Sequence, residues 1–260
     1  MQMTTPEKTS KPKSKTLGRR IKAAINWPSK AAVRKLESVM GKGSLVGDKP
    51  VFDNRDFPWA GQLEANAHII REELANVIEL RDALPTMQYI SKTQKKIIKT
   101  DGWKTYFFTA FGERADRNCE RCPQTAALLD KIPDLEAAFF SILAPGSHIR
   151  AHRGVYKGLV RAHLGLVVPE PSKDCRMAVG DEMVYWKEGE CVVFDDTYQH
   201  EVWNDTDGVR VVLLIDVHRP LPPALDRLNK ALLRMARMMP FVREPVRQHR
   251  AWEKEFYANA

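Results

Sequence analysis

Two histidines and an arginine in the second half of the chain have the residue types and the order that oxidative chemistry requires. His152 and His200 each lie where a strand-like apolar run meets a turn, and Arg210 opens the last strongly apolar run. Two imidazoles are common ligands for Fe(II), and a planar guanidinium can bind a dicarboxylate cosubstrate with two hydrogen bonds. This order of parts is typical of a non-haem iron oxygenase built on a β-barrel.

The usual third ligand of such a centre, a carboxylate two residues after the first histidine, is absent here. That position is Gly154, and the intervening Arg153 carries a charge that would repel iron. If His152 and His200 are catalytic metal ligands, water and cosubstrate must complete the coordination. Asp196 is close enough in sequence to accept a hydrogen bond from metal-bound water. Histidines of β proteins more often complete a hydrogen-bonded core, and the spacing alone does not decide between the two interpretations.

A run of alternating polar and apolar residues adds further candidates for the site. Arg161, His163 and Gly165 fall on one face of a predicted strand, while Leu164 and Leu166 fall on the other. Arg161 could therefore serve the site, or it could be an exposed strand charge.

Eight short β-rich runs lie between residues 138 and 217, separated by turns that contain Gly or Pro. This pattern predicts a mainly β protein with flanking helices, whose core is a double-stranded β-helix, the cupin-like jelly roll. Trp186 is expected to pack inside this barrel. The runs are AFFSIL, HIRAH, LVRAHLGLVV, CRMAV, EMVYW, CVVFDD, HEVWN and VRVVLLIDV.

Helical patterns flank this β core. Apolar spacing predicts one helix over 62–84, which Pro85 ends, and a shorter one over 125–131, with a strand over 105–111 between them. A further helical pattern follows residue 220 and could contact a lipid surface, although packing on the barrel is the commoner fate. Its apolar side consists of Leu225, Leu228, Leu232, Met235 and Met239.

The chain therefore divides into three expected parts. Residues 1–50 form a basic, partly disordered arm with short amphipathic helices, 51–220 form the oxygenase domain with its β core at about 138–220, and 221–260 form a helical extension. The first 50 residues hold 12 of the 41 Lys and Arg residues but three of the 33 acidic ones. Such an arm would be attracted to an anionic membrane surface or to nucleic acid, or it could be a solvated tail.

Composition and cysteine usage limit the remaining classes. The chain is 43% hydrophobic and 28% charged, and its four Cys do not form a disulfide framework. Its longest apolar runs are strand-sized, and no secretory signal is evident. We expect a cytoplasmic protein, with the inner face of the membrane as a peripheral site. Cys119 and Cys122 could bind a metal or form a redox pair, but no second such pair exists, so a packing role is favoured.

The segment from about residue 140 to 220 closely resembles the aspartyl/asparaginyl β-hydroxylase family of 2-oxoglutarate-dependent oxygenases. The resemblance implies Fe(II) as the metal, with 2-oxoglutarate and O₂ as cosubstrates. It also implies that His152 and His200 ligate the iron while Gly154 replaces the carboxylate. The segments that carry it, in this order, are FSILAPGSHIRAHRG, RAHLGLVVP, FDDTYQHEVWN and RVVLLIDVHRP.

The same resemblance assigns roles around the cosubstrate. Arg210 and Ser141 would bind the distal carboxylate of 2-oxoglutarate, and Arg161 and His163 would bind its other end or the substrate. Upstream, the segments DGWKTYFFTAFG and NCERCPQTAALLDKIP are similar to those of the bacterial branch that hydroxylates acyl chains of lipid A and ornithine lipids. The lipid A enzymes begin with a hydrophobic anchor, whereas this chain begins with a basic arm.

The expected function is therefore hydroxylation of a fatty-acyl chain in a membrane lipid. The alternative within the family is β-hydroxylation of Asp or Asn in a peptide or protein, which would be indifferent to membranes. A third possibility is a non-catalytic, cupin-like binding protein, which would show no iron-dependent oxygen consumption. Because the missing carboxylate leaves room for a halide ion at the metal, halogenation is a further alternative. The expected partners are the lipid substrate and an anionic membrane surface bound by the basic arm, and no nucleic acid is expected.

Overall fold

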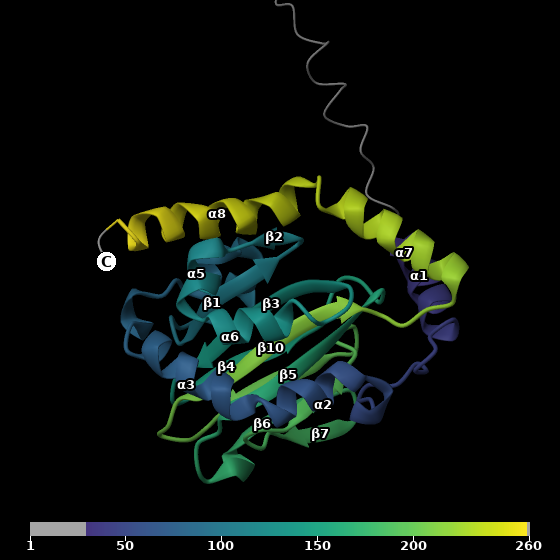
Figure 1. Ribbon diagram of the computed structural model, residues 1–260. Helices are drawn as coiled ribbons and strands as arrows, with labels where there is room; N and C mark the ends of the chain where they lie inside the picture. The colour runs from purple at the N-terminus through teal and green to yellow at the C-terminus, as the bar shows by residue number, and fades with distance from the viewer. Residues whose placement is uncertain (1–29, 259–260) are drawn as a thin grey trace, which may run out of the picture.

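A computed structural model describes residues 30–258 of the chain, and two antiparallel β-sheets form its centre (Figure 1). The larger sheet has the strand order β2-β1-β3-β10-β5-β8, and the smaller one has the order β4-β9-β6-β7. The strands are β1 (Trp103–Ala110), β2 (Glu113–Arg114), β3 (Leu135–Leu143), β4 (Ser147–His152), β5 (Leu159–Val167), β6 (Cys175–Val179), β7 (Glu182–Tyr185), β8 (Cys191–Phe194), β9 (His200–Asn204) and β10 (Arg210–His218).

The eight strands from β3 to β10 form the expected double-stranded β-helix. Along the chain, β3, β5, β8 and β10 join the larger sheet, while β4, β6, β7 and β9 join the smaller one. Each predicted β-rich run corresponds to one of these strands. The prediction of a jelly-roll core with flanking helices is therefore confirmed.

Helices surround this core on one face and at one end. Figure 1 shows α2, α3, α5 and α6 along the larger sheet, and α7 and α8 following one another across one end. The helices are α1 (Lys30–Lys42), α2 (Pro58–Ala65), α3 (Ala67–Ile78), α4 (Met87–Ile90), α5 (Asp116–Arg121), α6 (Pro123–Leu129), α7 (Pro223–Ala236) and α8 (Pro240–Phe256), with short 3₁₀ turns at Asn54–Asp56, Arg81–Ala83, Lys92–Lys96 and Ser172–Asp174.

The central strand β10 separates two hydrophobic clusters because its side chains alternate between the faces of the sheet. Leu213 and Ile215 point toward the covering helices and join a cluster with residues of α2, α3 and α6. Val212 and Leu214 point toward the smaller sheet and join a second cluster between the two sheets. Arg210 lies two residues before Val212 and therefore points to the same face of the strand, which places its charged side chain inside the jelly roll.

The helical prediction over 62–84 is wrong in its bounds and continuity. The chain is already helical at Pro58, breaks at Asn66, and resumes as α3, which ends at Ile78. Asn66 has φ −111° and ψ 14°, and its side-chain amide donates to the carbonyl of Gln62. Asparagine competes with the helix by bonding the local backbone, so a continuous apolar spacing did not reveal the break.

Part of the predicted arm is packed on the body. The backbone N–H of Leu45 donates to the carbonyl of Pro220 at 3.0 Å, and that of Asp195 donates to the carbonyl of Pro50 at 2.9 Å. One of the short amphipathic helices expected in the arm is observed as α1, and the part of the arm before residue 30 lies outside the described residues. Within residues 30–258, no helix is long and apolar enough to cross a bilayer.

Candidate active site

His152 and His200 lie side by side on neighbouring strands of the smaller sheet. His152 is the last residue of β4 and His200 the first of β9, where they are register partners after an irregularity in the pairing. Their ring centroids are 4.1 Å apart. Nδ1 of His152 lies 2.8 Å from the carbonyl of Arg150, and Nδ1 of His200 lies 3.0 Å from that of Tyr198. Each carbonyl accepts the Nδ1 proton and leaves Nε2 with the lone pair that a metal requires.

Both imidazoles are held in the neutral form that binds metals. Burial lowers the pKa of His152, and burial together with the nearby His152 ring lowers the pKa of His200 to about 3. The Arg161 guanidinium lowers both pKa values further. Near neutral pH no proton has to leave either ring before a cation binds.

Gly154 and Asp196 occupy complementary space beside the histidine pair. The Gly154 N–H donates to the carbonyl of Asp196 at 2.6 Å. A Cβ atom at position 154 would lie 2.2 Å from Oδ1 of Asp196, so no other side chain fits while that carboxylate is in place. Burial raises the pKa of Asp196 to about 6. The carboxylate is thus able to accept or release a proton near neutral pH.

Arg161 reaches this site from β5 but already has two carboxylate partners. Its Nε and Nη2 donate to the two carboxylate oxygens of Asp216 at 2.7 and 2.9 Å. Its Nη1 lies 3.3 Å from Oδ2 of Asp196. Arg161 is therefore not the exposed strand charge that the sequence left possible. Its contacts show a group that fixes Asp196, and no pattern in the sequence indicated that Asp216 would hold it.

Arg210 is a buried cation without a carboxylate partner among the described residues. Its side chain is 1% exposed, and its Nη1 lies 3.5 Å from Oγ of Ser141. The guanidinium carbon lies 4.8 Å from the ring centre of Trp186, and Nε has no hydrogen-bond partner in residues 30–258. Burial lowers the pKa of Arg210 to about 10. Ser141 also accepts a hydrogen bond from Trp103 Nε1 at 3.0 Å.

Other polar atoms near Arg210 also lack partners. Neither ring nitrogen of His163 is hydrogen-bonded within the described part of the chain, and the same holds for Nε1 of Trp186. The two rings are neighbours, with centroids 5.9 Å apart. Burial and the Arg210 charge keep the pKa of His163 well below its usual value. Buried donors without partners are costly, so this group is suited to an anion with several oxygen atoms. Trp186 was expected only to pack the barrel, and its unpartnered N–H was missed.

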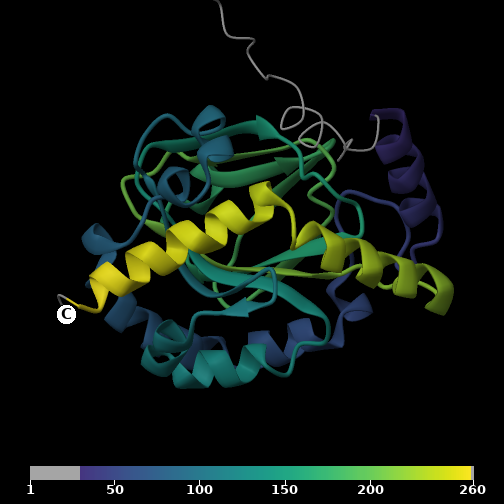
Figure 2. The ribbon, with the colours of Figure 1, turned by 90° about the horizontal axis from the view of Figure 1, so that it is seen from above.

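A cavity of about 290 Å³ lies beside His152. At one end it is lined by His152, Gly154, Arg161 and Asp196. Its walls are mainly apolar and include residues of α8, which crosses the end of the jelly roll in the view of Figure 2. The apolar wall residues include Met87, Ile90, Trp103, Phe107, Phe139, Leu214, Pro245 and Val246. The role of α8 in this cavity could not be read from the helical spacing.

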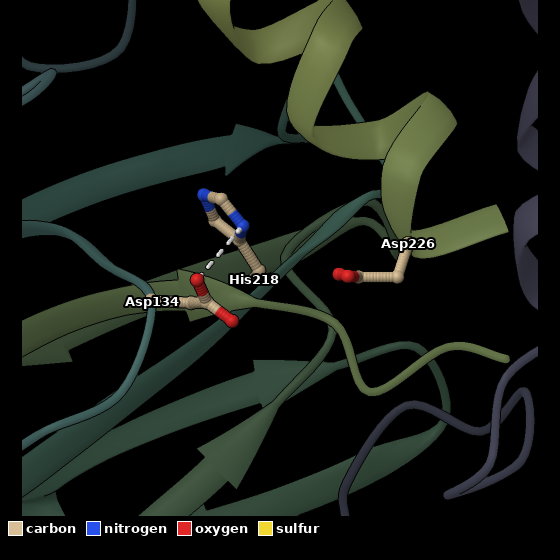
Figure 3. Close-up of side chains that lie close together, drawn as sticks. All are labelled: Asp134, His218 and Asp226. Carbon is tan, nitrogen blue, oxygen red and sulfur yellow. Dashed lines mark ion pairs between the residues drawn. The ribbon is translucent and has the colours of Figure 1, made fainter. Parts of the chain in front are cut away.

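A second group of potential metal ligands lies between β10 and α7. Figure 3 shows Asp134, His218 and Asp226, whose ligand atoms lie within 4.8 Å of one another. Lys230 already forms ion pairs with both carboxylates, because its Nζ lies 3.0 Å from Asp134 and 3.2 Å from Asp226. Its ammonium group provides the positive charge that the two carboxylates require. The histidine pair therefore remains the better candidate for a metal.

Cys119 and Cys122 are free thiols in the cluster beneath the larger sheet. Burial raises the pKa of Cys119 to about 11 and that of Cys122 to about 12. Their Sγ atoms lie near the carbonyls of Phe108 and Glu73. Protonated, buried thiols of this kind pack as small apolar groups, as the sequence favoured.

Comparison with known proteins connects this geometry to a family. The family described as aspartyl/asparaginyl beta-hydroxylase matches residues 64–220. The chain is 44% identical over 224 residues to the ornithine lipid ester-linked acyl 2-hydroxylase of Rhizobium tropici, covering 86% of this chain and 80% of that protein. It is 31% identical over 163 residues to the human aspartyl/asparaginyl beta-hydroxylase, covering 61% of this chain and 21% of the human one. A solved Pseudomonas putida prolyl-4-hydroxylase is 22% identical with a TM-score of 0.38, covering 60% of this chain and 88% of that one.

Proposed function

The chain belongs to the aspartyl/asparaginyl β-hydroxylase family of 2-oxoglutarate-dependent oxygenases, and from that premise we propose that it hydroxylates a fatty-acyl chain of a membrane lipid. The Rhizobium tropici relative is named for this reaction on ornithine lipid. Fe(II) and 2-oxoglutarate are the cofactor and cosubstrate in this proposal. The observation that carries it is the buried Arg210, which has no anionic partner within the described residues.

The histidine pair fits an iron ion. His152 and His200 present Nε2 from adjacent strands, and their Nδ1 atoms are fixed by backbone carbonyls. Because Gly154 supplies no carboxylate, the protein would provide two ligands and leave the other positions to small molecules. Fe(II) held there would use O₂ and the oxidation of 2-oxoglutarate to succinate and CO₂ to hydroxylate an unactivated C–H bond.

The residues around Arg210 would bind 2-oxoglutarate. The planar guanidinium matches a carboxylate, with Ser141 Oγ beside it as a further donor. His163 and Trp186 Nε1 have unsatisfied hydrogen-bonding atoms in the same buried region. A bound dicarboxylate would satisfy these groups and neutralise a charge that burial otherwise makes costly.

Asp196 and Arg161 act beside the iron position in this proposal. Arg161 orients the Asp196 carboxylate, and Asp216 in turn fixes Arg161 with two hydrogen bonds. Asp196 would accept a proton from a water molecule at the site, because its pKa of about 6 lies close to neutral pH. The roles of these two residues thus lie in positioning and proton transfer.

The substrate class follows from the cavity walls. The cavity is lined by apolar side chains such as Phe107, Phe139 and Leu214, which suit methylene groups better than a peptide carboxylate. The printed function of the Rhizobium tropici relative supports the same substrate class. The alternative, β-hydroxylation of an Asp or Asn side chain, would use the polar lining residues, such as Arg153 and Arg250, rather than the apolar walls.

The test is lipid mass spectrometry of host membranes from cells that carry the wild-type chain or His200→Ala. We expect a gain of one oxygen atom on an acyl chain with the wild type and none with His200→Ala. His148→Ala is the matched control, because His148 lies on the same sheet but pairs with Glu201 at the surface. If purified wild-type protein converts 2-oxoglutarate to succinate while the lipids stay unchanged, the lipid substrate is wrong and peptide substrates become the next assay.

A further inference from the structure

The inner face of α7 is attached to the body by several polar contacts in addition to the buried Leu233. The Asn229 side chain donates to the carbonyl of Gly158 at 2.9 Å and accepts from the Tyr156 hydroxyl at 2.7 Å. Lys230 bridges Asp134 and Asp226, and Figure 3 shows Asp226 pointing from α7 toward the loop that carries Asp134. These directional contacts fix which side of α7 faces the barrel.

The outer face of α7 is apolar and exposed. We call its residues the α7 stripe. Met238, just beyond the helix end, is 70% exposed and Met235 is 50% exposed. Amphipathic helices of globular proteins normally bury most of their apolar residues, whereas α7 buries Leu233 and leaves this second apolar face exposed. The apolar side predicted for this helix is partly exposed, because Leu228 and Met235 face solvent while Leu225 and Leu232 on the same side are half-buried. The α7 stripe consists of Ala224, Leu228, Ala231, Met235 and Met238.

Basic side chains flank the α7 stripe. Arg227 and Arg234 are exposed on α7, and Arg243 and Arg247 are exposed on the adjoining α8. The one acidic residue of α7, Asp226, is paired with Lys230 on the inner side. An apolar stripe bordered by arginines is the pattern of a helix that lies in the interfacial region of an anionic membrane.

Helix α7 lies beside a loop that lines the cavity. The loop 153–158 is held against α7 by Tyr156 and Gly158, and its Val155 lines the cavity while being 75% exposed. Figures 1 and 2 both show α7 leading directly into α8, whose Val246 lines the same cavity. A flat partner in contact with α7 would therefore also lie close to the opening.

We propose that the α7 stripe docks this protein onto an anionic lipid bilayer, with the cavity entrance next to the membrane surface. The purpose of the docking rests on the proposed lipid function, whereas the docking itself rests on the exposed face of α7. A second copy docked through the same stripe would bring two sets of arginines into one interface, which is unfavourable. An anionic bilayer instead offers headgroups to the arginines and acyl chains to the α7 stripe.

The first test is co-sedimentation of the full chain with vesicles. The vesicles contain equal parts of phosphatidylglycerol and phosphatidylcholine, or phosphatidylcholine alone. We expect the double variant Met235→Glu/Met238→Glu to bind the anionic vesicles about tenfold or more weakly than the wild type, because it replaces apolar contacts with like charge. Met183→Glu is the matched control, since Met183 is 48% exposed on β7 and outside the α7 stripe.

A second measurement places the α7 stripe in the bilayer directly. All four native cysteines are buried, and burial raises their pKa values, so an introduced surface thiol should react selectively. Met235→Cys, labelled with an environment-sensitive fluorophore, should shift its emission to the blue on anionic vesicles. Met183→Cys with the same label should not shift.

The outcomes separate docking from catalysis. Unchanged vesicle binding by the Met235→Glu/Met238→Glu variant, or no emission shift from the label at position 235, overturns the docking. Conversion of a dimer to a monomer by that variant, without a change in vesicle binding, also overturns it and identifies a second copy as the partner. Activity on detergent-dispersed lipid should be retained by the variant. If the wild type itself lacks that activity, the proposed function fails while the docking result remains valid.

Discussion

Replacing Arg210 with methionine should have opposite effects on the cosubstrate-free and the cosubstrate-bound protein. Arg210 is buried beside Trp186 and Ser141, and no carboxylate among the described residues neutralises it. If its partner is 2-oxoglutarate, the free protein contains an uncompensated buried charge. Arg210→Met should therefore stabilise the free protein and remove its response to 2-oxoglutarate.

The size of the first effect follows from the pKa of Arg210. Burial lowers this pKa from 12.5 to about 10, and each pKa unit corresponds to about 1.4 kcal/mol. The buried charge thus destabilises the free protein by about 3 kcal/mol, and the contact with the Trp186 ring offsets about 1 kcal/mol of this. We expect the free energy of unfolding of the free Arg210→Met protein to rise by about 2 kcal/mol, or the Tm by about 5 °C.

Arg219→Met is the matched control. Arg219 is also 1% exposed, but its guanidinium pairs with Asp195 and its Nε donates to the carbonyl of Lys157 at 2.6 Å. Its removal leaves buried polar groups without partners, so we expect the free energy of unfolding to fall by about 3 kcal/mol. Two equally buried arginines should thus respond with opposite signs.

Urea unfolding under anaerobic conditions, with Fe(II) and with or without 2-oxoglutarate, measures both effects. The wild type should gain stability from 2-oxoglutarate, whereas Arg210→Met should bind it roughly 100-fold more weakly, as expected for losing a charge-assisted pair. The reasoning is refuted if Arg210→Met destabilises the free protein as much as Arg219→Met does. It is equally refuted if 2-oxoglutarate stabilises the wild type and Arg210→Met alike.

Three further predictions concern other parts of the site. Burial, with the charge of Arg250, lowers the pKa of His249 to about 4, so the free energy of unfolding should fall as the pH falls from 6.5 toward 4. In urea unfolding, the wild type should lose about 2 kcal/mol more than His249→Gln between pH 7 and pH 5, and equal losses in the two proteins would contradict this. Gly154→Ala should cost about 1–3 kcal/mol by crowding Asp196, and a double-mutant cycle with Asp196→Ala should show coupling rather than additivity. Val246→Trp should narrow the cavity and shift hydroxylation to shorter acyl chains in lipid mass spectrometry, whereas an unchanged chain-length distribution would exclude Val246 from the substrate path.

Much of the β core could be predicted because its signals are local. A strand of four to nine residues is visible as a β-rich run between turn residues, and all eight predicted runs became strands. The proposed histidine ligands were visible as residue types at strand ends, and they became register partners. The break at Asn66 was missed because the apolar spacing continues across it while the backbone does not.

The sequence by itself determined the strands, the types of the reactive residues and, through strand parity, that Arg210 shares a face with Val212 and Leu214. Tertiary structure alone decided that Asp216 holds Arg161, that Trp186 contributes an unpartnered N–H and that α8 forms a wall of the cavity. It also decided which face of α7 is exposed. The physical reason is that the face to which a strand residue points follows from its position among its neighbours in the sequence. Ion pairs and cavity walls instead depend on groups that folding brings together from distant segments.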